Sequence, residues 1–244
     1  MKAGLQGKNM VWGLAVSLGI LLCSAGWVAA ETHGSGVSAD QALQKLMEGN
    51  KNYVENKLTN AARTNAAIRE SLATSQKPYA IILTCSDSRV PPEMIFDAGL
   101  GEIFIVRVAG NIPDPVILGS IEYAAEHLGS PLIMVLGHER CGAVTATVDA
   151  KGKSTGSRNI DAIVKTIQPN VALAAQHCPV CQEDKKCRET KKKEFVECVI
   201  DTNAQTVAAN LTKKSPILKH LAAEKKIKIV SAKYDLDDGK VTLF

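Results

Sequence analysis

Three short apolar runs constrain the fold of this chain more than any other feature of its sequence. Each is rich in Ile and Val and bounded by Gly or Pro, and they are "YAIILT" at 79–84, "EIFIVRV" at 102–108 and "PLIMVLGH" at 131–138. Runs of this length and composition are typical of buried β-strands. Between the second and third runs, apolar residues recur at helical spacing over 114–129. A strand, a helix and a strand in this order predict a right-handed βαβ unit in a mainly parallel sheet.

The segments around these runs have helical patterns. Ser38 is a candidate N-cap for an amphipathic helix at 39–57, and further helices are expected around 65–75, 143–150, 159–176 and 194–212. The segment 215–244 predicts a helix, a strand, a tight Asp-Gly turn and a short final strand. We therefore expect an α/β fold with a mainly parallel central sheet flanked by helices, an N-terminal helical arm and a short C-terminal strand pair.

The first 30 residues have the pattern of a secretory signal peptide. Lys2 and Lys8 precede an apolar run at 10–23, and Val28 and Ala30 occupy the two positions that define a cleavage site. A single transmembrane anchor is the alternative, but the apolar run is short for one. We expect cleavage near Ala30, which would leave an exported protein, periplasmic or secreted, without a stable membrane anchor. The remaining residues, 31–244, suit one domain.

Cleavage at that point changes the charge and the aromatic content. It removes two lysines and no acid, so the net charge falls from +4 to +2, which is not the basic footprint of a nucleic-acid-binding protein. It also removes both tryptophans, Trp12 and Trp27. Six cysteines remain, and an oxidising compartment would allow some of them to pair.

Side chains that bind metals follow two of the predicted strands. Cys85, Asp87 and Arg89 come directly after the first run, and His138 ends the third run with Cys141 three residues beyond it. Because the carboxyl ends of parallel strands share one edge of a sheet, we expect these side chains to converge. Two thiolates, an imidazole and a carboxylate form a ligand set for zinc. A Cys85–Cys141 disulfide, a core histidine and a local Asp87–Arg89 ion pair are the alternatives.

The number of ligands decides what such a zinc ion could do. If Asp87 is the fourth ligand, the site is closed and resembles a structural one. If Asp87 turns away and pairs with Arg89, a water can take the fourth position, and its pKa falls to about 7. Asp87 would then accept a hydrogen bond from the zinc-bound hydroxide and orient it toward an electrophile. A small apolar pocket would suit an uncharged electrophile such as carbon dioxide.

With these motifs the sequence resembles the β-class carbonic anhydrases. The motifs that carry the resemblance are "CSDSR" at 85–89, "RVAGN" at 107–111, "GSIEYAAEHLG" at 119–129 and "GHERCG" at 137–142. The resemblance runs from about Ser38 through the final strand. It implies reversible hydration of carbon dioxide to bicarbonate and a proton, with one zinc ion per subunit bound by Cys85, His138 and Cys141.

The resemblance also implies further roles and an assembly. Asp87 would be either the fourth zinc ligand or the partner of Arg89, and Gln76 would lie near the carbon dioxide site. The unit would be a homodimer, often further assembled, in which the helix at 38–58 embraces the neighbouring subunit. Some closed members of the family have a bicarbonate pocket built partly from a tryptophan. The mature chain has none, and this favours the open form, although Arg107 stands at a matching position.

A cysteine-rich insertion at about 176–199 departs from the family pattern. It carries four cysteines and a lysine run: Cys178, Cys181, Cys187, Cys198 and Lys191–Lys193. Two disulfides stapling a solvated loop are favoured by the even number of cysteines and by export. A second, structural zinc site with His177 nearby is the alternative.

Two other functions use the same residues. A hydrolase of carbon disulfide or carbonyl sulfide would keep the fold and the zinc ion and change the substrate. A non-catalytic zinc-binding module would have Asp87 permanently closing the site, and Arg89 beside Asp87 argues against it.

Overall fold

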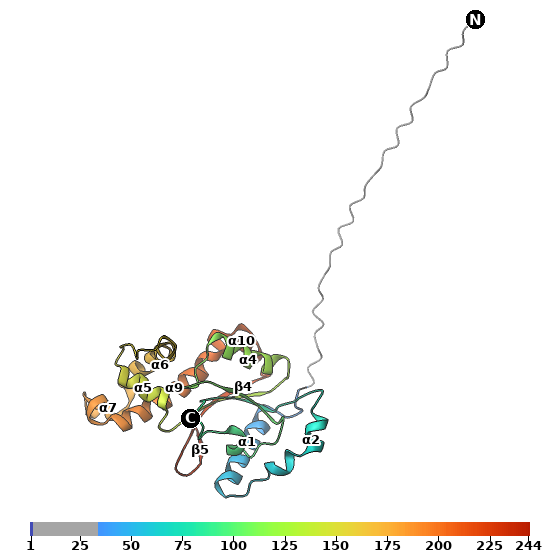
Figure 1. Ribbon diagram of the computed structural model, residues 1–244, viewed down its shortest axis with the longest axis horizontal. Coiled ribbons are helices and arrows are strands. Elements are labelled where there is room, and N and C mark those ends of the chain that lie inside the picture. The colour runs from blue at the N-terminus through green and yellow to red at the C-terminus, as the bar shows by residue number, and fades with distance from the viewer. Residues whose placement is uncertain (2–33) are drawn as a thin grey trace. The chain divides into compact units, whose positions relative to one another are not determined.

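The computed structural model describes Met1 and residues 34–244 of the chain. The predicted signal peptide and its cleavage site therefore lie outside the described residues. The expected α/β architecture is confirmed for residues 34–244. A single sheet is flanked by helices on both faces (Figure 1). Within the described part of the chain, no helix is long and apolar enough to cross a membrane.

The sheet has five strands in the order β2-β1-β3-β4-β5. The first four strands in this order run parallel to one another, and β5 pairs antiparallel with β4 as the predicted C-terminal strand pair. The strands are β1 (Ala80–Thr84), β2 (Ile103–Arg107), β3 (Leu132–His138), β4 (Lys228–Tyr234) and β5 (Val241–Leu243). All three runs singled out in the sequence are thus strands of this sheet.

Buried side chains alternate between the two faces of the central strands. Ile82 and Met134 pack on the face that α1 covers, whereas Ile81, Leu83 and Val135 pack on the opposite face. This alternation follows from the two-residue period of a strand. Figure 1 shows α1 on one side of the sheet and α4, α9 and α10 on the other. Because both faces are covered, the strands read as continuous apolar runs.

The predicted helices are confirmed, with differences at their ends, and the described chain also has three short helices that were not predicted, α3, α7 and α8. Their bounds are α1 (Ala39–Val54), α2 (Ala66–Ser71), α3 (Pro92–Ile95), α4 (Pro115–Glu126), α5 (Gly142–Ala150), α6 (Arg158–His177), α7 (Pro179–Glu183), α8 (Cys187–Thr190), α9 (Lys192–Lys214) and α10 (Pro216–Ala223), with a 3₁₀ turn at Asn60–Arg63. Ser38 caps α1 as expected, since its Oγ accepts the Gln41 N–H at 3.2 Å and the Gln41 side chain accepts the Ser38 N–H. The helix predicted at 65–75 is shorter and ends at Ser71.

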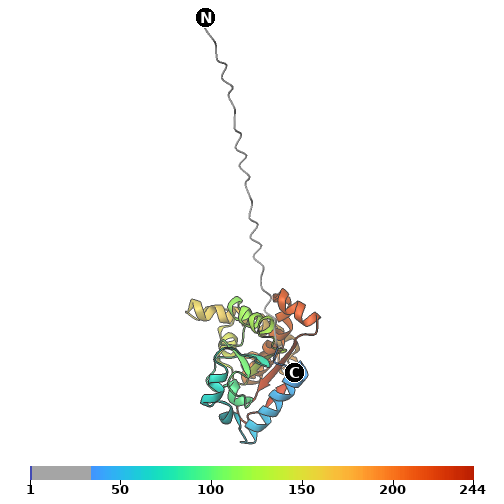
Figure 2. The ribbon, with the colours of Figure 1, turned by 90° about the vertical axis from the view of Figure 1, so that its right-hand side faces the viewer.

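Helix α1 packs against its own chain. Ala42 and Leu46 are fully buried in the core beneath the sheet. Asn50 accepts the Val241 N–H at 2.9 Å and donates to the Gly239 carbonyl at 2.8 Å, so that α1 lies beside the C-terminal strand (Figure 2). Any contact that α1 makes with a neighbouring subunit must therefore use its exposed face.

Replacing Gly49 with alanine is expected to destabilise the fold. A Cβ at Gly49 would stand 1.9 Å from the Phe96 carbonyl oxygen, which is backbone and cannot give way. Forced overpacking of this kind costs about 1–3 kcal/mol or more. Gly119 is the matched control, because a Cβ there has open space and helical alanine is favoured over glycine by about 1 kcal/mol. Urea unfolding midpoints should fall for Gly49→Ala and hold or rise for Gly119→Ala; equal midpoints would contradict the packing argument.

Candidate metal centre

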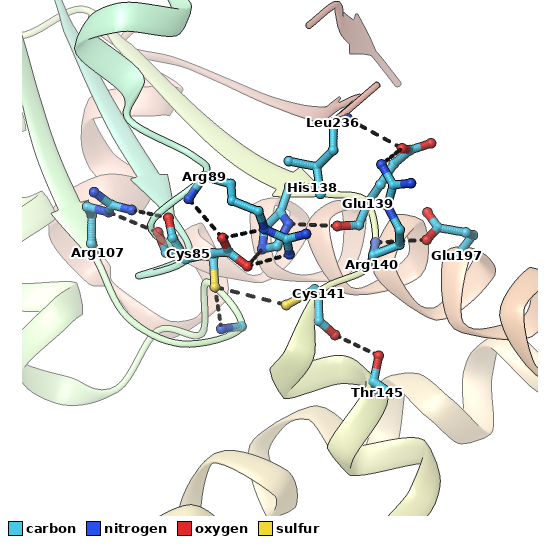
Figure 3. Close-up of polar contacts among 12 residues, drawn as sticks. Cys85, Arg89, Arg107, His138, Glu139, Arg140, Cys141, Thr145, Glu197 and Leu236 are labelled. Carbon is cyan, nitrogen blue, oxygen red and sulfur yellow. Dashed lines mark hydrogen bonds and ion pairs between the residues drawn. The ribbon is translucent and has the colours of Figure 1, made fainter. Parts of the chain in front are cut away.

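The side chains singled out in the sequence meet at the carboxyl edge of the sheet. Cys85 follows the last residue of β1, and His138 is the last residue of β3. The two strands are parallel neighbours, with Thr84 opposite Leu136. Cys141 lies three residues beyond the end of β3 and is the N-cap residue of α5. Adjacent parallel strands therefore bring these residues together, as predicted from the sequence (Figure 3).

Cys85, His138 and Cys141 form a compact, buried group. Their ligand atoms all lie within 4.8 Å of one another, and the side chains are 5%, 0% and 1% exposed. The two Sγ atoms are 4.0 Å apart and both cysteines are free. This separation is about twice the S–S bond length, so the disulfide considered as an alternative is not formed.

The donor set fits a zinc ion. Two thiolates at about 2.3 Å from one tetrahedral zinc ion would stand about 3.8 Å apart, close to the observed sulfur separation. The Nδ1 atom of His138 donates to the Glu139 carbonyl at 2.8 Å, which leaves the lone pair on Nε2. Nε2 is buried and has no hydrogen-bond partner among the described residues. A buried nitrogen lone pair without a donor, beside two thiols, is the arrangement that a metal ion completes.

The two thiols influence each other strongly. The Cys141 thiol donates a hydrogen bond to Cys85, and this contact is the largest cause that lowers the pKa of Cys85 to about 4. His138 and the Gly110 N–H lower the same pKa by smaller amounts. The hydrogen bond with Cys85 and then burial raise the pKa of Cys141. Backbone N–H groups at the start of α5 favour the Cys141 thiolate, as expected at a helix N-terminus. Their effect on the pKa is smaller than that of the Cys85 contact and burial. The pair thus holds one negative charge readily, and a cation would favour the second.

Asp87 pairs with Arg89 at the edge of this group. Its Oδ1 accepts the Arg89 backbone N–H at 2.9 Å and Nε–H at 3.0 Å, and its Oδ2 accepts from Nη2 at 2.8 Å. Hydrogen bonding from Arg89 holds the pKa of Asp87 well below its usual range. Asp87 Oδ2 lies 3.9 Å from His138 Nε2, so the carboxylate stands next to the donor set without belonging to it. Of the two arrangements considered from the sequence, the structure has the Arg89-paired one.

Arg107 holds the backbone that carries these residues. Its Nε donates to the Cys85 carbonyl at 2.9 Å and its Nη2 donates to the Asp87 carbonyl at 2.6 Å. In the sequence, Arg107 belongs to the "RVAGN" motif and stands at a position that matches the family's bicarbonate pocket. In the structure it clamps the "CSDSR" segment from the neighbouring strand β2 (Figure 3).

Gln76 lies away from the Cys85–His138–Cys141 group. It is exposed and precedes the amino end of β1, whereas Cys85 follows the carboxyl end of that strand. It lines a hollow of about 960 Å³ together with Met94, Leu100 and Tyr123. The structure therefore does not bring Gln76 to the metal centre of the same chain.

The cysteine-rich insertion contains two disulfides, Cys178–Cys198 and Cys181–Cys187. The favoured prediction of two disulfides is confirmed, and these four cysteines leave no thiolates for a second zinc site. His177 is hydrogen-bonded to Thr202 through Nε2 at 3.3 Å. The connectivity joins the end of α6 to α9 by one disulfide and closes the short α7–α8 segment by the other.

Comparisons with known proteins agree on one family. The family model described as carbonic anhydrase matches residues 80–241. Carbonic anhydrase 2 of Mycobacterium tuberculosis and the carbonic anhydrase of Mycolicibacterium smegmatis are each 36% identical over 203 residues, which cover 83% of this chain and 91% of either relative.

Solved structures share the fold. The β-carbonic anhydrase CcaA has a TM-score of 0.65 at 22% identity, covering 83% of this chain and 94% of that one. A structure described among two tetrameric β-carbonic anhydrases of Sordaria macrospora has a TM-score of 0.63 at 21% identity, covering 84% and 97%. With the family match over most of the chain, this fold and a Cys-His-Cys donor set at the carboxyl edge of its sheet, the chain belongs to the carbonic anhydrase family, in its β class.

Proposed function

We propose that this chain hydrates carbon dioxide reversibly to bicarbonate and a proton, with one zinc ion per subunit bound by Cys85, His138 and Cys141. The observation that carries the proposal is the buried donor set with its unpartnered His138 Nε2, flanked by an Asp87 carboxylate that is already paired. A zinc ion bound there supplies a nucleophile near neutral pH, because it lowers the pKa of a coordinated water to about 7.

The protein's own groups prepare the site for this reaction. Asp87 stays ionised because of Arg89. Its carboxylate can therefore accept a hydrogen bond from the attacking water and orient the water's lone pair. Arg89 keeps the carboxylate from turning into the donor set. The Glu139 carbonyl fixes the tautomer of His138 and increases the basicity of its Nε2.

The alternatives are supported less well. The relatives that match most of the chain are named carbonic anhydrases, which favours carbon dioxide over carbon disulfide or carbonyl sulfide. A structural zinc module would need a fourth protein ligand to close the site. Asp87 is the nearest carboxylate, and it is bound to Arg89 by three hydrogen bonds instead.

Stopped-flow measurement of carbon dioxide hydration tests the proposal. Purified residues 31–244 and their Asp87→Ala variant would be compared from about pH 6.5 to 9, a range that brackets the expected water pKa. We expect activity at neutral pH that the variant loses. Activity that appears only at alkaline pH would mean that Asp87 is a ligand released by base. No hydration by protein that binds zinc would reject carbonic anhydrase activity and bring the sulfur substrates forward.

We further propose that the protein is exported and works as a homo-oligomer. The signal-peptide pattern of residues 1–30 supports export. Met94, Leu100 and Tyr123 are large apolar side chains, 41%, 44% and 49% exposed, around the hollow that Gln76 lines, and they suit burial by a second copy. A role for Gln76 in the reaction would require such a copy. Native mass spectrometry of protein recovered outside the cytoplasm would give both the N-terminus and the assembly; an intact residue 1 or a monomer would contradict the corresponding proposal.

A further inference from the structure

The loop between two of the metal ligands has an unfavourable backbone conformation. Arg140 lies between His138 and Cys141 and has a φ of 52°. This left-handed region is costly for a residue with a side chain, and such a conformation persists only where surrounding contacts impose it. The relative placement of His138 Nε2 and Cys141 Sγ depends on this loop. Some contact must therefore hold Arg140 in place.

Glu197 of α9 makes that contact. Its Oε1 accepts the Arg140 backbone N–H at 2.9 Å (Figure 3). The Arg140 side chain makes separate ion pairs with Asp237 at 2.9 Å and Glu139 at 3.3 Å. The peptide group and the side chain of Arg140 are thus held by different partners, and the Glu197 bond acts directly on the backbone between the two ligands.

Glu197 lies beside a basic side chain on one side and next to a disulfide along its own helix. Lys233 of β4 lies 3.8 Å from its Oε2 and 2.8 Å from Asp201 Oδ1, one turn further along α9. The next residue after Glu197 is Cys198, whose disulfide with Cys178 ties α9 to the end of α6. The cysteine-rich insertion therefore braces α9 at the position from which Glu197 reaches the ligand loop.

The same helix also supports the third ligand. Asn203 donates to the Gly110 carbonyl at 3.0 Å and accepts from Asn170 of α6 at 2.8 Å, and both asparagines are buried. The Gly110 N–H in turn donates to Cys85 Sγ at 3.4 Å. Helix α9 thus contacts the loops on both sides of the donor set, and α6 is joined to it by a disulfide and by a buried amide pair.

We propose that Glu197 is a positioning residue for the metal centre, held in register by the Cys178–Cys198 disulfide of the insertion. It fixes the left-handed Arg140 between His138 and Cys141, so the three ligands are arranged before a metal ion arrives. This inference rests on the metal site of the proposed function but not on the identity of the substrate. It gives the insertion a purpose, which is to brace the donor set.

Zinc affinity of the purified chain, measured by competition with a chromophoric chelator, tests the proposal without using enzyme activity. Glu197→Ala should weaken zinc binding about 10- to 100-fold, as loss of an outer partner of a metal ligand typically does. Glu197→Gln keeps an oxygen that can accept the same N–H and should lose less than about tenfold. Arg140→Gly combined with Glu197→Ala should recover most of the affinity, because glycine adopts a positive φ without strain.

The two disulfides provide a matched pair for the brace. The double variant Cys178→Ser with Cys198→Ser should weaken zinc binding. The control, Cys181→Ser with Cys187→Ser, also removes one disulfide, but one further along the chain from Glu197, and it should bind zinc as the unaltered chain does. The absorption spectrum of the Co²⁺-substituted protein should shift in the first pair and not in the second.

Several results would overturn the proposal. They are unchanged affinity in Glu197→Ala, no recovery in the Arg140→Gly background, or equal losses in the two disulfide variants. The double variant with Arg140→Gly also keeps the test decisive if Glu197→Ala alone fails to fold. An unaltered chain that binds zinc but does not hydrate carbon dioxide would reject the proposed function while leaving the Glu197 result standing.

Discussion

Replacing His138 with alanine is expected to abolish zinc binding and, with it, carbon dioxide hydration. The variant removes the buried Nε2 that has no protein partner and leaves two thiols, 4.0 Å apart, as the remaining donors. Two ligands are fewer than any catalytic zinc site uses. Without the metal, a water keeps its ordinary pKa instead of one near 7, so the loss in rate should be at least about 10³-fold.

His220→Ala is the matched control for this experiment. His220 lies on the surface of α10, and its contact with Glu224 at 3.3 Å is exposed. The control should retain one zinc ion per chain and full activity. Zinc content measured by inductively coupled plasma mass spectrometry, together with stopped-flow hydration, gives both readouts. If His138→Ala kept its zinc ion and most of its activity, His138 would not be a ligand and the site would need another donor.

The metal ligands could be predicted from the sequence because their placement follows from one topological rule. Cys85 directly follows β1 and His138 ends β3, and parallel neighbours bring such residues to one edge. The absence of a tryptophan from the mature chain favours the open form, but the motif itself does not decide the arrangement of Asp87, since both arrangements use the same short motif. Which applies depends on Arg89 completing three hydrogen bonds to the carboxylate, and on Arg107 clamping the backbone beneath them.

Contacts between backbone and distant side chains were beyond sequence reasoning. Glu197 is 57 positions from Arg140, and its partner there is a peptide N–H, which any residue provides. The nearby sequence feature that points to this region is the cysteine-rich insertion, which places two cysteines close to the helix that carries Glu197. Four cysteines allow three pairings, and only the packing of α6 against α9 selects Cys178–Cys198.

Helix α1 shows the same limit. The resemblance implies that this helix embraces a neighbouring subunit, whereas its amphipathic pattern alone predicts a buried face and not the surface that buries it. Gly49 lets α1 approach Phe96 closely, and Ala42 and Leu46 fill the core under the sheet. An amphipathic face is equally well satisfied by a neighbouring subunit or by its own chain. The close approach at Gly49 is what directs it inward here.

Replacing Arg89 with alanine is expected to lower the turnover number by about 100-fold while zinc remains bound. Arg89 contacts Asp87 and none of the three ligands directly. Without it, the Asp87 carboxylate loses two of its three hydrogen bonds, and only the backbone N–H bond remains. Asp87 Oδ2 already lies 3.9 Å from His138 Nε2, so a freed carboxylate could turn toward the donor set and displace water. Arg158→Ala, an exposed arginine at the start of α6, is the control and should leave the turnover number unchanged.

The pH dependence separates loss of orientation from loss of charge. Arg89 depresses the pKa of Asp87, and its removal lets that pKa rise toward the ordinary value of about 3.9. Asp87 therefore stays ionised at neutral pH in the variant, and no new acidic limb should appear in the rate profile above about pH 6. The pKa of Asp87 is lower in the folded chain than in the unfolded chain. The stability that the Asp87–Arg89 pair contributes is therefore present above about pH 4 and is lost as pH falls. Arg89→Ala should thus keep about a hundredth of the turnover number at neutral pH and should also differ from the unaltered chain in acid unfolding. Full activity in the variant would mean that Asp87 needs no such partner for the reaction.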